Sequence, residues 1–201
     1  GTEAFAATSD KAGVYRSIDN GVTWKKIFVG LLATKVYNIV CNSAGDALAA
    51  TDDGVYRFVK NSDEWRKTNT LLADTVVYAV AVTTGYVLAG TLSTGEIFRM
   101  VDAFNPPADP APVRFDSLPG YTFLTTFKIP SGPFLLGTNH GAFRSTDTGK
   151  TWYRIPNGMG SDTTMVTAFA YSGTRLYAVA YGSLYRSADN GNRWVSLQRS
   201  P

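Results

Sequence analysis

A module of about 42 residues that recurs along the chain is the strongest constraint on its fold. An aromatic–arginine pair marks each copy, and the five arginines are Arg16, Arg57, Arg99, Arg144 and Arg186. Successive arginines lie 41, 42, 45 and 42 positions apart. A fixed period of this length indicates an architecture assembled from copies of one supersecondary unit. The sequence therefore predicts five units, at 1–29, 30–70, 71–119, 120–157 and 158–201.

Each unit contains stretches typical of four short strands. In the second copy an alternating segment (Val36–Cys41) precedes a small apolar strand (Leu48–Thr51), the Tyr56-Arg57 pair follows, and Trp65 opens the last strand. Gly, Asn, Asp, Ser and Pro separate these stretches, as turns between strands require. Four strands in this length match one propeller blade. We predict one all-β domain over 1–201, a β-propeller of five four-stranded antiparallel blades.

The first unit lacks the alternating segment, because the chain reaches Phe5–Thr8 almost at once. Three interpretations remain open: a shortened chain, a three-stranded first blade without its inner strand, or an arc of a larger ring. We favour a five-bladed ring with an imperfect first blade. The chain starts Gly1-Thr2-Glu3 without Met or a signal peptide, so we interpret its N-terminus as trimmed.

Composition narrows the class of partner. The residues are 44% hydrophobic and 17% charged, which is typical of a globular domain. A net charge of +3 with no run of five basic residues argues against nucleic acid. The single cysteine cannot form an intramolecular disulfide. No apolar run approaches the roughly 18 residues of a membrane-spanning helix, so no transmembrane segment is expected.

The connection between the third and fourth strands carries a recurring motif, Ser-x-Asp-x-Gly-x-Thr-Trp, in which Arg193 replaces Thr in the last copy. We expect the Asp to accept hydrogen bonds from backbone N–H groups two or three residues on, the Gly to adopt a positive φ, and the Trp to pack against neighbouring strands. A turn held in this way fixes the register of a hairpin. The motif residues are Ser17, Asp19, Gly21, Trp24, Ser145, Asp147, Gly149, Trp152, Ser187, Asp189, Gly191 and Trp194.

These residues match the Asp box, and the chain resembles the Asp-box or BNR-repeat propellers. That group includes sialidases, the sortilin ectodomain, xyloglucanase-type hydrolases and photosystem II assembly factors. The resemblance implies a propeller whose boxes lie on the outer edge of the blades, away from the central site. It does not imply a sialidase, because Tyr153–Pro156 imitates the sialidase signature but follows the box in the fourth copy.

The sequence contains few of the residue patterns that metal binding or catalysis would require. One histidine and one cysteine cannot form a zinc cluster, and Asp52-Asp53 lacks the spacing of a calcium loop. We therefore predict no metal, no cofactor and no catalytic residue. An arginine at the same place in every copy is more typical of framework than of a carboxylate-binding triad.

A binding face remains. In propellers the B–C and D–A loops of one face gather around the central channel, and here they carry tyrosines mixed with acidic and polar residues, which suit sugar stacking or a protein contact. The candidates are Asp10, Lys11, Lys35, Tyr37, Asp52, Asp53, Tyr78, Tyr121, Asn139, His140 and Tyr181. Packing of Tyr37 and Tyr78 between blades is the alternative.

The hypothesis is a monomeric, non-catalytic binding or scaffolding module of an exported bacterial protein, extracellular or periplasmic, with a protein or glycan partner. The alternatives are a glycoside hydrolase-like enzyme, whole or as a fragment, and an assembly factor for a membrane complex.

Overall fold

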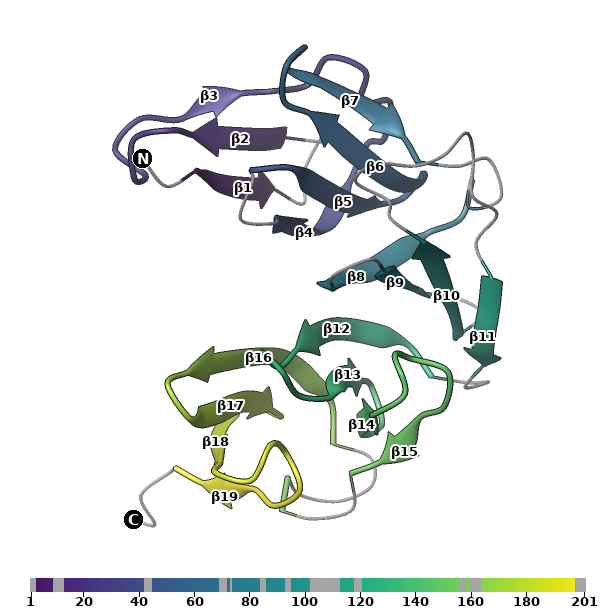
Figure 1. Cartoon of the computed structure of the whole chain (residues 1–201), viewed down its shortest axis with the longest axis vertical. Coiled ribbons are helices and arrows are strands. Elements are labelled where there is room, and N and C mark those ends of the chain that lie inside the picture. Colours follow the sequence, from purple (N-terminus) through teal and green to yellow (C-terminus); the bar gives the residue numbers. More distant parts are fainter. Residues whose placement is uncertain are drawn as a thin grey trace. The chain divides into compact units, whose positions relative to one another are not determined.

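The structure is a computed structural model. It describes residues 3–8, 13–41, 45–68, 72, 74–83, 86–92, 95–101, 113–117, 121–155, 158–159 and 164–197. Within these ranges every regular element is a β-strand (Figure 1). None of the described residues forms a helix long and apolar enough to cross a membrane.

By their contacts the residues divide into two compact units. Unit 1 comprises 1–91 and 98–113, and unit 2 comprises 92–97 and 114–201. Each of the five sheets lies within one of the repeat segments expected from the sequence. The assignment of all 201 residues to one domain stays a prediction.

Unit 1 opens with a three-stranded sheet and continues with a four-stranded one. The first contains β1 (Ala4–Thr8), β2 (Gly13–Ser17) and β3 (Lys25–Lys26), in chain order. The second contains β4 (Val36–Cys41), β5 (Ala47–Thr51), β6 (Gly54–Val59) and β7 (Glu64–Lys67), joined as antiparallel hairpins. The third sheet has the order β11-β10-β9-β8, with β8 (Val77–Thr83), β9 (Tyr86–Thr91), β10 (Glu96–Val101) and β11 (Val113–Ser117). Residues 96–97 and 114–117 of this sheet are assigned to unit 2 and the others to unit 1.

Unit 2 contains two four-stranded antiparallel sheets, drawn in green and in olive to yellow in Figure 1. One holds β12 (Phe123–Lys128), β13 (Phe134–Thr138), β14 (Gly141–Ser145) and β15 (Tyr153–Arg154). The other holds β16 (Val166–Ser172), β17 (Arg175–Ala180), β18 (Ser183–Ser187) and β19 (Val195–Ser196). These meanders agree with the all-β, four-stranded repeat expected from the sequence.

Small residues on β5 and β13, the second strands of their sheets, leave room for close packing against neighbouring strands. In unit 2 a Cβ built on Gly137 of β13 would lie 2.5 Å from the carbonyl oxygen of Val166 on β16. In unit 1 the equivalent strand β5 is Ala-Leu-Ala-Ala-Thr and is buried along its whole length. Apolar side chains fill the space between sheets, and Ala49, Tyr56 and Trp65 belong to one such core. A larger side chain at these positions would force the sheets apart.

The first strand of each four-stranded hairpin set carries an irregularity at its second residue. The register shifts between Val36 and Asn38 on β4, and between Val77 and Ala79 on β8. The same shift occurs on β12 and β16 in unit 2. A bulge re-aims the extra residue away from the regular ladder. In unit 1 the extra residues are Tyr37 and Tyr78.

Candidate functional site

The three motif turns (residues 17–24, 145–152 and 187–194) share one hydrogen-bonding scheme. In the first, Ser17 Oγ donates to Asp19 Oδ1 at 2.7 Å and accepts from Gly21 N at 2.8 Å. Thr23 N donates to Asp19 Oδ1 at 2.9 Å, and Trp24 Nε1 donates to Gly21 O at 3.0 Å. The second and third turns repeat these bonds.

The main donor to each aspartate lies four residues on, one position farther than expected. Two successive residues in the left-handed region lengthen the turn, Asn20 with φ 63° and Gly21 with φ 86°. Thr148 and Asn190 take the same conformation in the other turns. The bonds hold the carboxylates in their charged form. Those from Thr23 lower the pKa of Asp19 to about 2.

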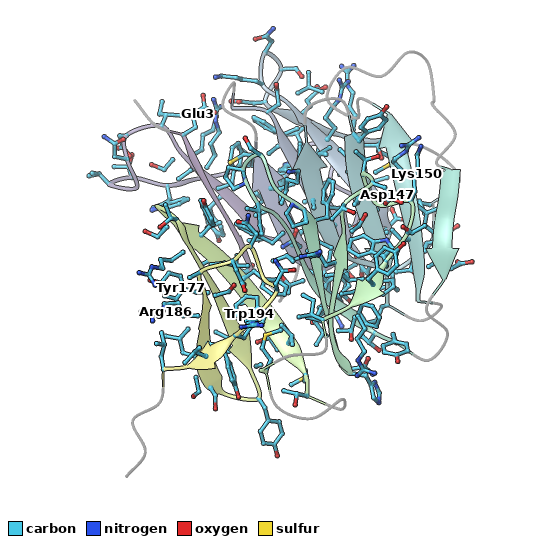
Figure 2. The ribbon with its side chains drawn as sticks, turned by 60° about the horizontal axis from the view of Figure 1, so that its bottom comes forward. Glu3, Asp147, Lys150, Tyr177, Arg186 and Trp194 are labelled. Atoms are coloured by element: carbon cyan, nitrogen blue, oxygen red, sulfur yellow. The ribbon has the colours of Figure 1, made fainter. Side chains whose placement is uncertain are left out.

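Asp147, labelled in Figure 2, behaves in the same way. Burial would raise its pKa, but hydrogen bonds from Thr151 and Ser145 outweigh this and lower the pKa to about 2. Its carboxylate is therefore ionised and fully engaged at neutral pH. The motif turns are structural clamps on the outer hairpins, and they leave no carboxylate free for chemistry.

The tryptophans of these turns differ in burial. Trp194 is 5% exposed, whereas Trp24 is 44% exposed, contrary to the expected packing. The reason lies in the connection that follows the preceding sheet. A Cβ on Gly158 would lie 2.2 Å from Trp194 O, and Met159 belongs to the same core as Trp194, so the described part of that connection packs against Trp194. The segment 27–29, which follows the first sheet, contacts Trp65 in a similar way. Trp65 N donates to Val29 O, and Trp65 Nε1 donates to Ile27 O. No described segment of unit 1 covers Trp24 in this way.

Three of the repeated arginines contact other side chains of the framework, the role that the sequence predicts for them. Arg16 pairs with Asp63 of the next sheet at 2.8 Å and with Glu3 at 3.1 Å. Arg99 stacks over the ring of Tyr86, 4.4 Å from its centroid. Arg144 donates from Nη1 to Asn192 Oδ1. Charged and planar donors of this type latch one strand or sheet to another.

Two candidates from the loops, Asp52 and Asn139, also serve the framework. Asp52 Oδ1 accepts from Thr34 N at 2.9 Å and from Lys35 N at 3.0 Å. Asn139 Oδ1 accepts from Thr122 N at 2.8 Å in unit 2. Each residue begins the turn after the second strand of its sheet and ties down the segment that leads into the first strand. Burial opposes the charge of Asp52, but these bonds lower its pKa overall.

Asp53 is engaged as completely. Its Oδ1 accepts from Lys67 Nζ at 2.6 Å, and its Oδ2 accepts from Tyr56 Oη at 2.5 Å. Burial acts against its charge, yet the Lys67 and Tyr56 bonds lower the pKa of the carboxyl. Burial and the adjacent Asp53 raise the pKa of Tyr56. Asp53 is thus an ionised anchor between β6, β7 and the following segment.

Tyr37 and Tyr78, the bulge residues of β4 and β8, do come together. Their rings stack with centroids 4.6 Å apart and planes 28° apart, and both side chains are half-buried. Because β4 and β8 belong to neighbouring sheets, the pair joins two sheets, as the packing alternative required. The rings also remain accessible, which leaves the binding alternative open. Lys35 is exposed next to Val36, where β4 begins.

In unit 2 the remaining candidates form an aromatic group and one isolated side chain. Tyr121 meets His140 edge-on with centroids 5.5 Å apart, and Phe143 with centroids 5.4 Å apart. Tyr181 is 82% exposed and takes a positive φ of 47° in the turn between β17 and β18. Asp10 and Lys11 lie outside the described residues. The described residues contain no group of three or more His, Cys, Asp or Glu side chains that could hold a metal ion.

Comparisons with known proteins place the fold. No family model and no curated protein matches the chain. Solved structures do. A GH74 xyloglucanase from Xanthomonas campestris gives a TM-score of 0.70 at 18% identity, over 98% of this chain and 36% of that one. YCF48 from Cyanidioschyzon merolae gives 0.69 at 18% identity, over 90% and 64%.

An extracellular domain from B. thetaiotaomicron gives a TM-score of 0.72 at 12% identity, over 93% of this chain and 26% of that one. YCF48 has also been solved bound to a D1 peptide. The chain spans less than two thirds of the length of these proteins. The fold and its repeated turns define an all-β propeller module. These neighbours share the β-propeller fold with the chain.

Proposed function

We propose that the chain is a non-catalytic binding module whose contact surface is built around the stacked pair Tyr37–Tyr78. The observation that carries this proposal is the geometry of the pair. Two adjacent inner strands both bulge at a tyrosine, and the rings meet at 4.6 Å in a half-buried position. Rigid aromatic rings offer a large contact area for a sugar face or a peptide at low entropic cost.

The state of the acidic residues supports a non-catalytic role. Glycoside hydrolysis requires a carboxylic acid of raised pKa opposite a second carboxylate. The described Asp and Glu residues whose pKa is shifted are Glu3, Asp19, Asp52, Asp53, Asp147 and Asp189, and each shift is downward. Asp52 and Asp53 are moreover bonded to Thr34, Lys35, Tyr56 and Lys67. Among the described residues, this pattern favours structural over catalytic carboxylates.

The alternatives draw on the neighbouring structures. An enzyme of the glycoside hydrolase type is the second candidate, since GH74 enzymes share the fold. An assembly factor for a membrane complex is the third, since YCF48 shares it and binds a D1 peptide. We place the module outside the cytoplasm of a bacterium, a location supported by the extracellular neighbour. The proposed partner is a glycan or a protein.

One set of measurements separates the three functions. Xyloglucan oligosaccharides and the D1 peptide are titrated against the protein by calorimetry, and the sugar mixture is then analysed for cleavage. We expect binding of one probe without cleavage. The double variant Y37A/Y78A should lose at least about tenfold in affinity, as expected for a buried aromatic anchor. Phe28, an exposed aromatic residue of unit 1 outside the pair, is the matched control, and F28A should bind as the parent does.

Other outcomes would decide against the proposal. Cleavage that disappears in D52N or D53N would establish an enzyme. Peptide binding that ignores the Tyr37–Tyr78 pair would favour the assembly-factor alternative and a different surface. Circular dichroism on each variant separates loss of the surface from loss of the fold.

The arrangement of the five sheets as the blades of one ring, in a monomer, is part of the same proposal. A compact ring of 201 residues should have a radius of gyration of about 16–17 Å. Small-angle scattering with light scattering measures both this radius and the mass. A much larger radius, or a mass above one chain, would contradict the closed monomeric ring.

A further inference from the structure

A surface pocket of about 110 Å³ in unit 2 has a strongly basic lining. It is bounded by Arg144, Tyr153, Arg154, Ile155, Gly191 and Asn192. Two guanidinium groups and a tyrosine that is 63% exposed therefore face one small space, and none of the lining residues is acidic. The pocket lies between the outer strands β14 and β15 and the motif turn of the next sheet.

The repeat supplies a counterpart to this pocket in unit 1. Arg16 on β2 occupies the same place as Arg144 on β14, since each is the residue just before the serine that opens a motif turn. In unit 1 this arginine is neutralised by two carboxylates. Asp63 binds Arg16 Nη1 at 2.8 Å, and Glu3 binds its Nη2 at 3.1 Å.

Neither of these carboxylates has a counterpart beside Arg144 in unit 2. Asn192 stands where Asp63 stands, because each lies two positions before the tryptophan of its outer turn. Pro133 stands where Glu3 stands, directly before the strand that pairs with the arginine strand. Arg144 therefore has the neutral side chain of Asn192 in place of Asp63, and no acceptor side chain in place of Glu3.

The donors left over point to an acceptor from outside. Arg144 donates from Nη1 to Asn192 Oδ1, and among the described residues its Nε and Nη2 groups meet no acceptor. Arg154, which replaces Lys26 of the first sheet, adds a second positive charge and donates from Nη2 to His140 O at 2.9 Å. A guanidinium fork matches the two oxygens of a carboxylate and is retained where such pairing is needed.

We propose that this pocket binds the carboxylate of an aspartate or glutamate side chain from a protein partner. Unit 1 shows the type of occupant, because there the acceptor Glu3 is a side chain on an extended segment entering a sheet. Tyr153 provides an exposed ring beside the pocket for the neighbouring residues of the partner. The site uses the outer strands of unit 2 and is independent of the Tyr37–Tyr78 surface.

Nitrogen-15 NMR of the whole protein tests this assignment. The probe is the peptide acetyl-Gly-Gly-Glu-Gly-Gly-amide at low ionic strength, with its Gln counterpart as the neutral control. We expect the Nε–Hε signals of Arg144 and Arg154 to shift with the Glu peptide, the signal of Arg16 to stay in place, and the Gln peptide to have no effect. R144Q should weaken binding at least about tenfold.

The decisive variant is N192D, which restores the carboxylate of unit 1 inside the pocket. It should fold normally, because Asp63 occupies the same place in the second sheet, and it should weaken peptide binding at least about tenfold. N20D, which makes the same change of charge in the first motif turn of unit 1, is the matched control and should bind as the parent does. Unchanged affinity in N192D, or equal shifts at Arg16, would overturn the site. Tighter binding of galacturonic acid or inorganic phosphate than of the Glu peptide would overturn the assignment to a protein side chain.

Discussion

The first and last motif turns share five of eight residues and the hydrogen bonds of the serine, the glycine and the tryptophan, yet their tryptophans lie in different surroundings. Trp24 is 44% exposed and Trp194 is 5% exposed. In both turns the serine, the aspartate and the glycine hold the same bonds, since those partners lie within four residues of one another. Burial of the indole depends instead on a segment of the neighbouring sheet. Local sequence thus determines the turn, and the segment that follows the preceding sheet determines how far the indole is buried.

The largest expected difference is between truncations of the two indoles. W194A should destabilise unit 2 by about 3–5 kcal/mol, because it leaves a cavity beside Leu135 and Leu176, which line the same core. W24A should cost about 1–3 kcal/mol, less than W194A, because nearly half of that side chain is already in water and its removal leaves no closed cavity. Urea unfolding followed by circular dichroism measures both. Equal losses would mean that a cover over Trp24 forms in solution.

The connection that covers Trp194 offers a second contrast. Gly158 has φ 97°, and a Cβ there would lie 2.2 Å from Trp194 O, so G158A should cost about 2–4 kcal/mol. Gly173 also has a positive φ of 62°, but nothing lies within 4 Å of its Cβ position. G173A should cost only about 1 kcal/mol, the price of the backbone conformation alone. Thermal unfolding of G158A and G173A measures both losses of stability. Similar losses in the two variants would argue against a steric clash between residue 158 and Trp194 O.

A smaller effect is expected at the serines. Ser187 Oγ accepts from Gly191 N at 2.9 Å in a buried setting, so S187A orphans a buried donor and should cost about 1–2 kcal/mol. Ser17 Oγ makes the same bond at 2.8 Å, but only partly buried, and water can replace it. S17A should therefore cost about 1 kcal/mol or less. Hydrogen exchange at Gly191 and Gly21 follows each bond directly. A larger loss of unfolding free energy in S17A than in S187A would contradict this ranking.

The features that the sequence predicted are those that repeat. The strands, the motif turns and the framework role of Arg16 follow from residues recurring at one place in each copy. The same logic could have identified Asp52 and Asn139 as framework, because both begin the turn after a Thr that ends a strand. The basic pocket could not be read in this way. It depends on contact between Arg144 and Asn192, 48 residues apart, and on what their counterparts in unit 1 are.

The smallest expected effect is on the pH dependence of the free energy of unfolding. The pKa of Asp19 is lowered to about 2, against about 4 in an unfolded chain, first by the Thr23 hydroxyl and then by the Thr23 N–H and Ser17. A depressed folded pKa stabilises the protein above the unfolded pKa, and this contribution disappears as the pH falls from about 4 towards 2.

In the last turn Arg193 replaces the threonine, so Asp189 lacks the hydroxyl bond, although its pKa is lowered as well. T23V, which removes only the hydroxyl from the first turn, should reduce the acid dependence there and imitate the last turn. Unfolding curves between pH 2 and pH 7 should show parent and variant differing at neutral pH and converging near pH 2. A difference that persists at pH 2 would mean that the hydroxyl stabilises the turn by a route other than the charged carboxylate.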